Sequence, residues 1–309
     1  MVARSVFPNG FPQGGVAIRN MPILNAYAGD VYWVDSGAGN NNNRGTERRP
    51  VATIDAAVSL CTASNGDIIM VKPGHAENIA DATTFQIDKA GIAVVGMGTG
   101  ALRPTFTFTA TAGSIEMDSA SCLLQNLRFV SSISAVVVGV NVDADDCAIV
   151  GCEFDFDTTG DDFLIYVDCE GVERTTIEGC QFIAEAAAGS NEAIRLDNAD
   201  YAKIVGNYFF GDFANAAIWS DTTNDTGDGS TVSAGILIAN NDIYNADTAN
   251  ATGIDLNNAD TGVIAYNNLG ALGSTAVSTL DPGSCLCFEN YGVTGINTHA
   301  IVVPTTADT

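Results

Sequence analysis

Two acidic segments contain the residues whose types and spacing best suit hydrolytic chemistry. They are residues 141–143 (NVD) and residues 160–162 (GDD), and Asp143 and Asp161 are 18 positions apart. Cleavage of a glycosidic bond uses a pair of carboxyl groups, one as acid and one as base. If the chain folds into stacked coils, Asp143, Asp161 and Asp162 would lie near one another as a glycan or calcium site. Asp and Gly are also the usual residues of loops between strands, and we favour that structural interpretation.

The same stretch also offers ligands for calcium, as a polysaccharide lyase would need. Seven aspartates between positions 143 and 162 supply the hard oxygen ligands that Ca²⁺ prefers. Arg174 is the nearest base candidate for removing a proton next to a carboxylate. One arginine among many acids does not define a site, so a solvated acidic face is the preferred interpretation. We predict neither a metal site nor a cofactor.

The two histidines offer little for acid–base catalysis. His75 stands in PGHAE, in a predicted loop near the N-terminal end of the fold, and His299 begins a short strand-like segment. The sequence contains no phosphate-binding loop, HExxH, GxSxG or EF-hand pattern. We therefore predict no catalytic residue.

Charge is unevenly distributed along the chain. There are 37 Asp and Glu against 12 Lys and Arg, a net charge of −25, and no Lys or Arg follows Lys203. Such a body repels nucleic acid and anionic membranes, so neither is expected as a partner. Residues 1–50 differ, because five arginines there outnumber three acidic residues. No apolar stretch approaches the ~20 residues of a membrane span and no secretory signal is recognisable, so we expect folding in a cytoplasm.

A repeat of 23 to 34 residues runs through most of the sequence and implies the elements that would position these side chains. Eight segments share four successive positions. The first is aliphatic, the second is variable, the third is usually Gly or Asn, and the fourth is usually Asn or Cys. They are AVVGMG, LLQNLRF, AIVGCEF, TIEGCQF, KIVGNYF, LIANNDI, VIAYNNL and LCFENYG. Short alternating segments precede most of them, namely SIEM, GVNV, LIYV, AIRL, AAIW and GIDL, with HAIV near the end. This pattern predicts an all-β, right-handed parallel β-helix of about eight coils.

One column of the repeat predicts a ladder of stacked side chains. The Gly or Asn before it suits the left-handed conformation that a sharp turn between strands requires. Asparagines stacked in successive coils can hydrogen-bond along the rod, and cysteines in the same column are expected to be reduced, buried packing residues. The predicted ladder residues are Cys152, Cys180, Asn207, Asn241, Asn267 and Asn290.

Residues 30–80 resemble the entrance of pectate-lyase-like β-helix proteins. The resemblance rests on a strand, a Gly/Asn loop, the segment PVATIDAAV and the segment GDIIMVKPG. It implies a helix from about Ala52 that covers the open end of the β-helix with Ile54, Ala57, Val58 and Cys61 on one face. We therefore divide the chain into an N-terminal arm (1–30), an entrance with a capping helix (31–90) and the coils (91–309).

The first hundred residues also resemble a group of structural proteins of tailed bacteriophages. The similar segments are ARSVFPNGF, GVAIRNMPILN, TIDAAVSLCTASNGDIIMVKPGHAE and IAVVGMGTGALRPTFTF. The resemblance implies a homotrimer on the virion surface, assembled in the host cytoplasm, that decorates or cements the capsid. We expect the arm to bind the major capsid protein, and the candidate docking residues are Arg4, Phe7, Phe11, Arg19 and Met21.

An enzyme or carbohydrate-binding protein is the alternative, such as a small tailspike, a lyase or a polygalacturonase-like hydrolase. Segments 141–143 and 160–162 partly match the N-T-D and G-D-D motifs of polygalacturonases. The G-H-G motif is missing, and Arg195 stands in IRLD without the lysine of R-I-K. We therefore predict a non-enzymatic structural protein.

Overall fold

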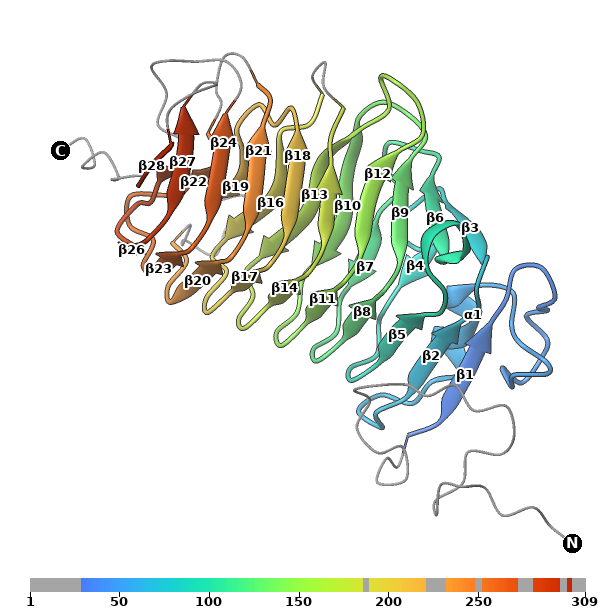
Figure 1. Ribbon diagram of the computed structural model, residues 1–309. Coiled ribbons are helices and arrows are strands. Elements are labelled where there is room, and N and C mark those ends of the chain that lie inside the picture. Colours follow the sequence, from blue (N-terminus) through green and yellow to red (C-terminus); the bar gives the residue numbers. More distant parts are fainter. Residues whose placement is uncertain are drawn as a thin grey trace, which may run out of the picture.

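The chain folds into a parallel β-helix, an elongated rod of stacked coils (Figure 1). The computed structural model describes residues 29–185, 189–220, 232–247, 252–271, 280–294 and 299–301. Each coil passes through three sheets, which we call sheets 1, 2 and 3 in the order in which the chain meets them. Within these residues, sheets 1 and 2 have ten strands each and sheet 3 has eight, so the predicted β-helix is confirmed.

The strands of each sheet follow one another from coil to coil. Sheet 1 contains β1 (Val31–Val34), β2 (Ile68–Val71), β5 (Ala93–Gly96), β8 (Leu123–Gln125), β11 (Ala148–Val150), β14 (Thr176–Glu178), β17 (Lys203–Val205), β20 (Ile236–Ala239), β23 (Gly262–Ala265) and β26 (Leu286–Phe288). Sheet 2 contains β3 (Ala76–Ile79), β6 (Thr105–Phe108), β9 (Arg128–Ser131), β12 (Glu153–Phe156), β15 (Gln181–Ile183), β18 (Tyr208–Gly211), β21 (Asp242–Asn245), β24 (Asn268–Ala271), β27 (Tyr291–Thr294) and β28 (His299–Ile301). Sheet 3 contains β4 (Phe85–Gln86), β7 (Ile115–Met117), β10 (Val136–Val142), β13 (Phe163–Glu170), β16 (Glu192–Asp197), β19 (Ala216–Ser220), β22 (Ile254–Asp255) and β25 (Leu280–Asp281). The short elements α1 (Ile54–Leu60) and the 3₁₀ turn η2 (Gly100–Leu102) lie outside the sheets.

The interior consists of columns of identical or similar side chains. Neighbouring coils pair residue for residue, so a side chain that points inward stacks on its counterpart in the next coil. In sheet 2 the rings of Phe154 and Phe182, and those of Phe182 and Phe209, are nearly parallel with centroids 4.8 Å apart. The separation of the ring centroids therefore equals the spacing between strands of neighbouring coils, and these rings are fully buried.

A single residue with positive φ turns the chain from sheet 1 to sheet 2 in seven successive coils. Asn, Gly, Gly, Gly and Asn occupy this position at residues 126, 151, 179, 206 and 240, as the repeat predicts. Tyr266 and Glu289 adopt the same conformation in the last two of these coils, with φ of 59° and 44°. The stacked neighbours therefore impose the turn even where the side chain disfavours it.

Replacing Glu289 with asparagine is expected to stabilise the last coils by up to about 1 kcal/mol, because asparagine tolerates the left-handed region better. Thermal unfolding followed by circular dichroism would show a higher melting temperature. Asn240→Ala, at the equivalent position, is the opposing control and should lower it. A lower melting temperature for Glu289→Asn would contradict this account of the turn.

The four asparagines of the predicted column form a continuous buried ladder. The Oδ1 atom of Asn241 accepts hydrogen bonds from the backbone N–H of Asn207 (2.9 Å) and from its Nδ2 (3.1 Å). The same pair of bonds joins Asn241 to Asn267 (3.0 and 2.9 Å) and Asn267 to Asn290 (3.1 and 2.9 Å). Each Nδ2 also donates to a sheet 1 carbonyl of the preceding coil, as Asn241 does to Ile204 (2.9 Å). The ladder thus satisfies backbone groups that a sharp turn would otherwise leave unpaired.

Cysteines continue this column toward the N-terminal end. The thiol of Cys180 lies 3.5 Å from the carbonyl oxygen of Ile149. One coil later, the side-chain amide of Asn207 occupies the equivalent position and donates to the carbonyl oxygen of Ile177. A thiol is a weak donor and cannot replace the Oδ1 acceptor, so the strong ladder ends where Asn207 Oδ1 accepts the Cys180 N–H (2.8 Å). All eight cysteines are free thiols, and seven of them are buried.

Helix α1 lies at the N-terminal end of the rod, beside β1, β2 and β4 (Figure 1). Thr53 caps the helix, since its hydroxyl accepts the Ala56 N–H at 3.3 Å. The four residues predicted to face the core, Ile54, Ala57, Val58 and Cys61, are buried. The capping helix of the entrance is therefore confirmed.

The other end of the rod differs from the expected pattern. The segment HAIV does not continue the series of GIDL and its predecessors, because β28 pairs with β27 in antiparallel fashion in sheet 2. The chain thus reverses along the last coil instead of beginning another sheet 3 strand. Within the described ranges, no helix has the length and apolar composition needed to cross a bilayer.

Candidate functional site

The three predicted aspartates do not converge. Asp143 follows the last residue of β10, whereas Asp161 and Asp162 precede the first residue of β13. These neighbouring strands pair in parallel with Val136 opposite Phe163, so Asp143 and the Asp161–Asp162 pair lie at opposite ends of the strands, about eight residues or ~26 Å apart. The alternative of a shared site of Asp143, Asp161 and Asp162 is therefore wrong, because nearness in sequence does not bring residues together at one end of paired strands.

Asp161 and Asp162 instead hold the turn before β13. The carboxylate of Asp161 accepts hydrogen bonds from the backbone N–H (3.2 Å) and hydroxyl (2.8 Å) of Thr158. Asp162 is buried, and its carboxylate accepts the backbone N–H of Ala135, a residue with a φ of 61°. Both aspartates therefore have structural partners of the kind that loop aspartates usually have.

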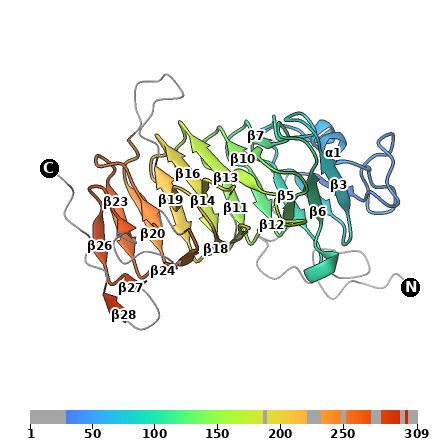
Figure 2. The ribbon, with the colours of Figure 1, turned by 90° about the horizontal axis from the view of Figure 1, so that it is seen from above.

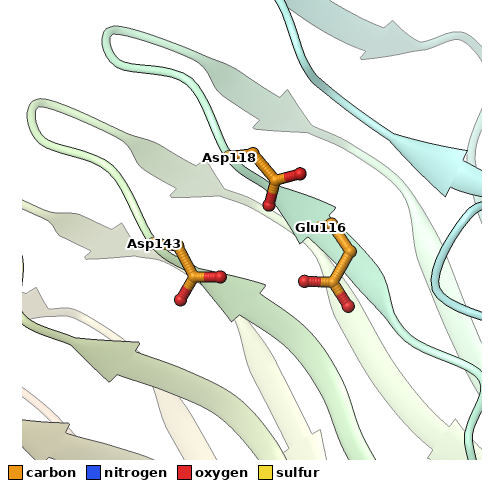
Figure 3. Close-up of side chains that lie close together, drawn as sticks. All are labelled: Glu116, Asp118 and Asp143. Atoms are coloured by element: carbon orange, nitrogen blue, oxygen red, sulfur yellow. The ribbon is translucent and has the colours of Figure 1, made fainter. Parts of the chain in front are cut away.

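Asp143 joins a different carboxylate cluster, on the outer face of sheet 3. One carboxylate oxygen from each of Glu116, Asp118 and Asp143 lies within 4.8 Å of the other two (Figure 3). Glu116 is in β7, and Asp118 and Asp143 follow the ends of β7 and β10. Asn141 bridges two of them, since its Nδ2 donates to Glu116 (3.2 Å) and to Asp143 (2.9 Å). We call these three carboxylates the sheet 3 acidic cluster.

The electrostatics of this cluster favour a bound proton or cation. Partial desolvation raises the pKa of Asp143 to about 6, and the charges of Glu116, Asp118, Glu170 and Asp168 add to the effect. A carboxyl group with this pKa can exchange protons near neutral pH. Three carboxylates within reach of one another are also the oxygen ligands that Ca²⁺ or Mg²⁺ takes. Among the described residues, these three carboxylates form the group whose oxygens lie close enough together to hold a metal ion.

Asp143 is expected to titrate near pH 6, and Glu116→Gln should lower its pKa toward the ordinary value of 3.8. Between these values the folded state holds a proton that the unfolded chain has lost, so this group's contribution to stability falls as the pH rises from about 4 to 6. Asp143 is exposed, so the effect on stability is small. A carbon-detected NMR titration of the carboxylates measures the shift directly. Asp146, whose pKa is lowered by its hydrogen bond to Arg174, is the internal control and should not move.

The acidic cluster belongs to a longer polar row on sheet 3. Arg195 lies beside Asp168 in the next strand, with Nε donating to Oδ1 at 2.8 Å and a second guanidinium–carboxylate contact. Trp219 is partly exposed beside Arg195, and Asp255 and Asp281 follow. Burial and the charge of Asp281 raise the pKa of Asp255 to about 6. In register order the row is Gln86, Glu116, Asn141, Asp168, Arg195, Trp219, Asp255 and Asp281.

The sequence contains a signal for this row in the short segments that form sheet 3. The segments SIEM, GVNV, AIRL, AAIW and GIDL are strands of sheet 3, and each contains or adjoins one member of the row. Aligning these strands on their outward position would have placed Glu116, Asn141, Arg195 and Trp219 in one line.

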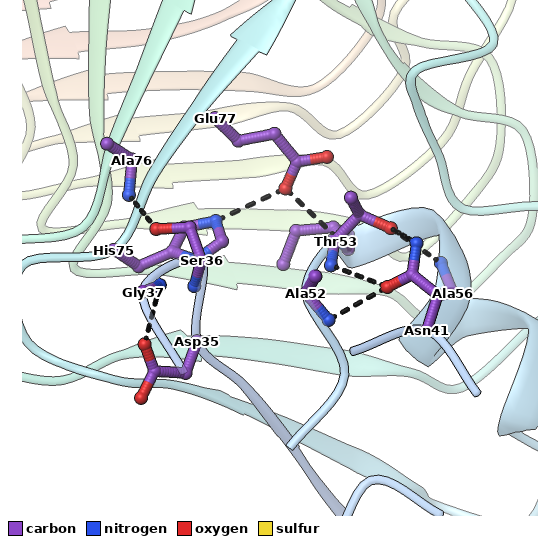
Figure 4. A network of polar contacts seen from close by, with 11 residues as sticks. Asp35, Ser36, Gly37, Asn41, Ala52, Thr53, Ala56, His75, Ala76 and Glu77 are labelled. Carbon is purple, nitrogen blue, oxygen red and sulfur yellow. Dashed lines mark hydrogen bonds and ion pairs between the residues drawn. The ribbon is translucent and has the colours of Figure 1, made fainter. Parts of the chain in front are cut away.

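His75 is a structural residue at the N-terminal end (Figure 4). It is buried, and its Nδ1 accepts the backbone N–H of Ser36 at 3.0 Å. Nε2 lies 3.2 Å from Glu77 Oε2, and the same oxygen accepts the backbone N–H of Ile54 at the start of α1 (3.1 Å). The histidine therefore joins the loop after β1 to the capping helix. The predicted docking residues Arg4, Phe7, Phe11, Arg19 and Met21 lie outside the described residues.

Comparison with known proteins finds only distant similarities in fold. No family model and no curated protein sequence matches the chain. Among solved structures it is similar to a rhamnogalacturonan lyase (TM-score 0.45, 12% identity, 85% of this chain and 74% of that chain) and to the GH136 lacto-N-biosidase from Eubacterium ramulus (0.41, 12%, 85% and 68%). It is also similar to ORF18 of Geobacillus virus E2 (0.33, 14%, 84% and 61%). All three are distant resemblances in fold.

Proposed function

We propose that the chain is a non-enzymatic structural protein of a phage virion, a rod that decorates or cements the capsid. The rod binds the major capsid protein end-on through its N-terminal end, which includes the arm of residues 1–30. It is assembled in the host cytoplasm and remains on the capsid surface.

The observation that carries this proposal is the separation of charge along the rod. Arg44, Arg48 and Arg49 are all exposed in the loop between β1 and α1. Helix α1 lies at the N-terminal end of the rod (Figure 2). The coils beyond Lys203 carry no Lys or Arg. A rod with a basic end and an acidic body is oriented by an acidic surface, because only the basic end is attracted. The similarity of the first hundred residues to phage structural proteins supports a shell as that surface.

A binding experiment with empty shells of the encoding phage tests the proposal. Purified wild-type protein should bind shells that lack it at a fixed ratio to the major capsid protein, and less at high salt. Arg44→Glu with Arg48→Glu and Arg49→Glu should weaken binding at least tenfold, and deletion of residues 1–28 should abolish it. Arg174→Gln, which changes a cation on the side of the rod paired with Asp146, is the matched control.

Unchanged binding of both the triple variant and the deletion would disprove end-on docking. Absence of the protein from purified virions would disprove the virion role altogether. Circular dichroism of each variant confirms that the β-helix is intact.

Carbohydrate binding or cleavage is the second candidate, and the polar row on sheet 3 favours it. Trp219 is partly exposed between Arg195 and Asp255, and an aromatic face beside charged hydrogen-bonding groups suits a sugar ring. A polysaccharide panel tests it by binding and by release of reducing ends. Trp219→Ala should abolish binding, and Glu116→Gln with Asp143→Asn should abolish release. If the wild-type protein binds and cleaves nothing in the panel, this candidate fails.

A further inference from the structure

The outer face of sheet 1 is largely apolar from β5 to β26. Two rows of side chains point outward from β5 to β26, in register from strand to strand. Row 1 is Ala93, Leu123, Ala148, Thr176, Lys203, Leu237, Val263 and Leu286, and row 2 is Val95, Gln125, Val150, Glu178, Val205, Ala239, Ala265 and Phe288. Twelve of these sixteen residues are apolar, and we call the two rows the sheet 1 outer face.

Sheet 3 and the first half of sheet 2 have polar outer faces, whereas the second half of sheet 2 carries the exposed aromatic residues Tyr208, Phe210 and Tyr291. Sheet 3 carries the polar row, and the first half of sheet 2 carries ion pairs of Arg128 with Glu153 (3.3 Å) and Asp155 (2.6 Å). On the sheet 1 outer face the large apolar residues with the highest exposed fractions are Leu286 and Phe288, at 63% and 51%. Eight strands span about 34 Å, and with the flanking turn residues the face is about 15 Å wide.

The two charged residues of this face are placed to complement each other in a second copy. Lys203 is in row 1 on β17 and Glu178 is in row 2 on β14, the next strand. Within the described part of the chain neither forms an ion pair. When parallel copies surround an axis along the rod, row 1 of one copy meets row 2 of the next. Measured along the rod axis, Lys203 of one copy is then one coil spacing, about 4.8 Å, from Glu178 of its neighbour.

An antiparallel arrangement loses this match. Reversing one copy while keeping the rows face to face places Lys203 opposite Thr176, and Glu178 opposite Val205. Both charges would then be buried in an apolar interface without a partner, which is strongly unfavourable. The parallel arrangement also brings Leu286 of one copy against Phe288 of the next, since the two lie in the same strand in opposite rows.

We infer that the sheet 1 outer face is the surface through which copies of this chain associate, side by side and parallel, as a homotrimer. Each copy contributes its apolar rows to the threefold axis, and the Glu178–Lys203 pairs between copies set the register. The inference does not depend on the proposed capsid role.

Sedimentation equilibrium of the full chain tests the inference. The wild type should have the mass of three copies, and Val205→Asp in row 2 should dissociate it. Ile183→Asp, a partly exposed residue on the outer face of sheet 2, is the matched control and should remain trimeric. A wild-type mass of one or two copies would overturn the inference, and so would an unaffected trimer in Val205→Asp.

Charge reversal at the two exposed charged residues tests the register without disturbing the core. Glu178→Lys and Lys203→Glu should each raise the dissociation constant on the order of tenfold or more, because each places like charges together. The double variant restores opposite charges and should recover most of the affinity. If the double variant is as weak as the sum of the two single variants, the pairing is wrong.

Discussion

Asn241→Ala is expected to lower the free energy of unfolding by about 4 kcal/mol, although it removes only a small polar side chain. Asn241 lies inside the ladder, 1% exposed, and its amide joins three coils. Alanine would leave the N–H of Asn207, one proton of its Nδ2 and the carbonyl of Ile204 without their partners. Each buried unpaired group costs about 1–3 kcal/mol, so the loss exceeds that of an ordinary hydrogen bond.

Urea unfolding of wild type and variant measures this difference, and Asn268→Ala is the matched control. Asn268 lies one residue after the ladder position of Asn267 but is exposed, and its amide makes one long contact with Asp242 (3.3 Å). Its removal should cost less than about 0.5 kcal/mol. Equal effects of the two substitutions would show that the ladder contributes nothing beyond local asparagine preferences.

Phe182→Ala is expected to cost about 4 kcal/mol through a different mechanism, the loss of packing in the sheet 2 column. Phe182 stacks on Phe154 below and Phe209 above, at 4.8 Å in both cases, and all three rings are fully buried. The strands on either side are fixed by their own hydrogen bonds, so the column cannot close over the missing ring. The resulting cavity adds to the lost transfer free energy.

Phe210→Ala is the control for this substitution. Phe210 follows Phe209 in β18 but points outward, is 40% exposed and stacks on Tyr244 at 5.3 Å. Its loss should cost about 1 kcal/mol. The same urea experiment distinguishes the two, and a loss below about 2 kcal/mol for Phe182→Ala would mean that the column collapses around the gap.

These two columns show why the fold could be predicted from the sequence. In a β-helix each coil repeats the environment of the last, so the same requirement recurs every 23 to 34 residues and becomes visible as a pattern. The left-handed turn selects Gly or Asn at residues 126 to 240, and the ladder selects Asn at 207, 241, 267 and 290. The capping helix was equally predictable, because its buried face follows the helical period.

The positions of the functional side chains could not be predicted in this way. Asp143 and Asp161 are near in sequence, yet they lie at opposite ends of neighbouring strands, while Asp143 meets Glu116 from the preceding coil. The polar row on sheet 3 and the apolar rows on sheet 1 likewise appear only when successive strands are aligned in register. The sequence by itself determined the coil, its turn and its interior ladder, because these depend on contacts that repeat. Only the tertiary structure decided which outward side chains share a face, because loops of unequal length separate the strands and the register alone brings them together.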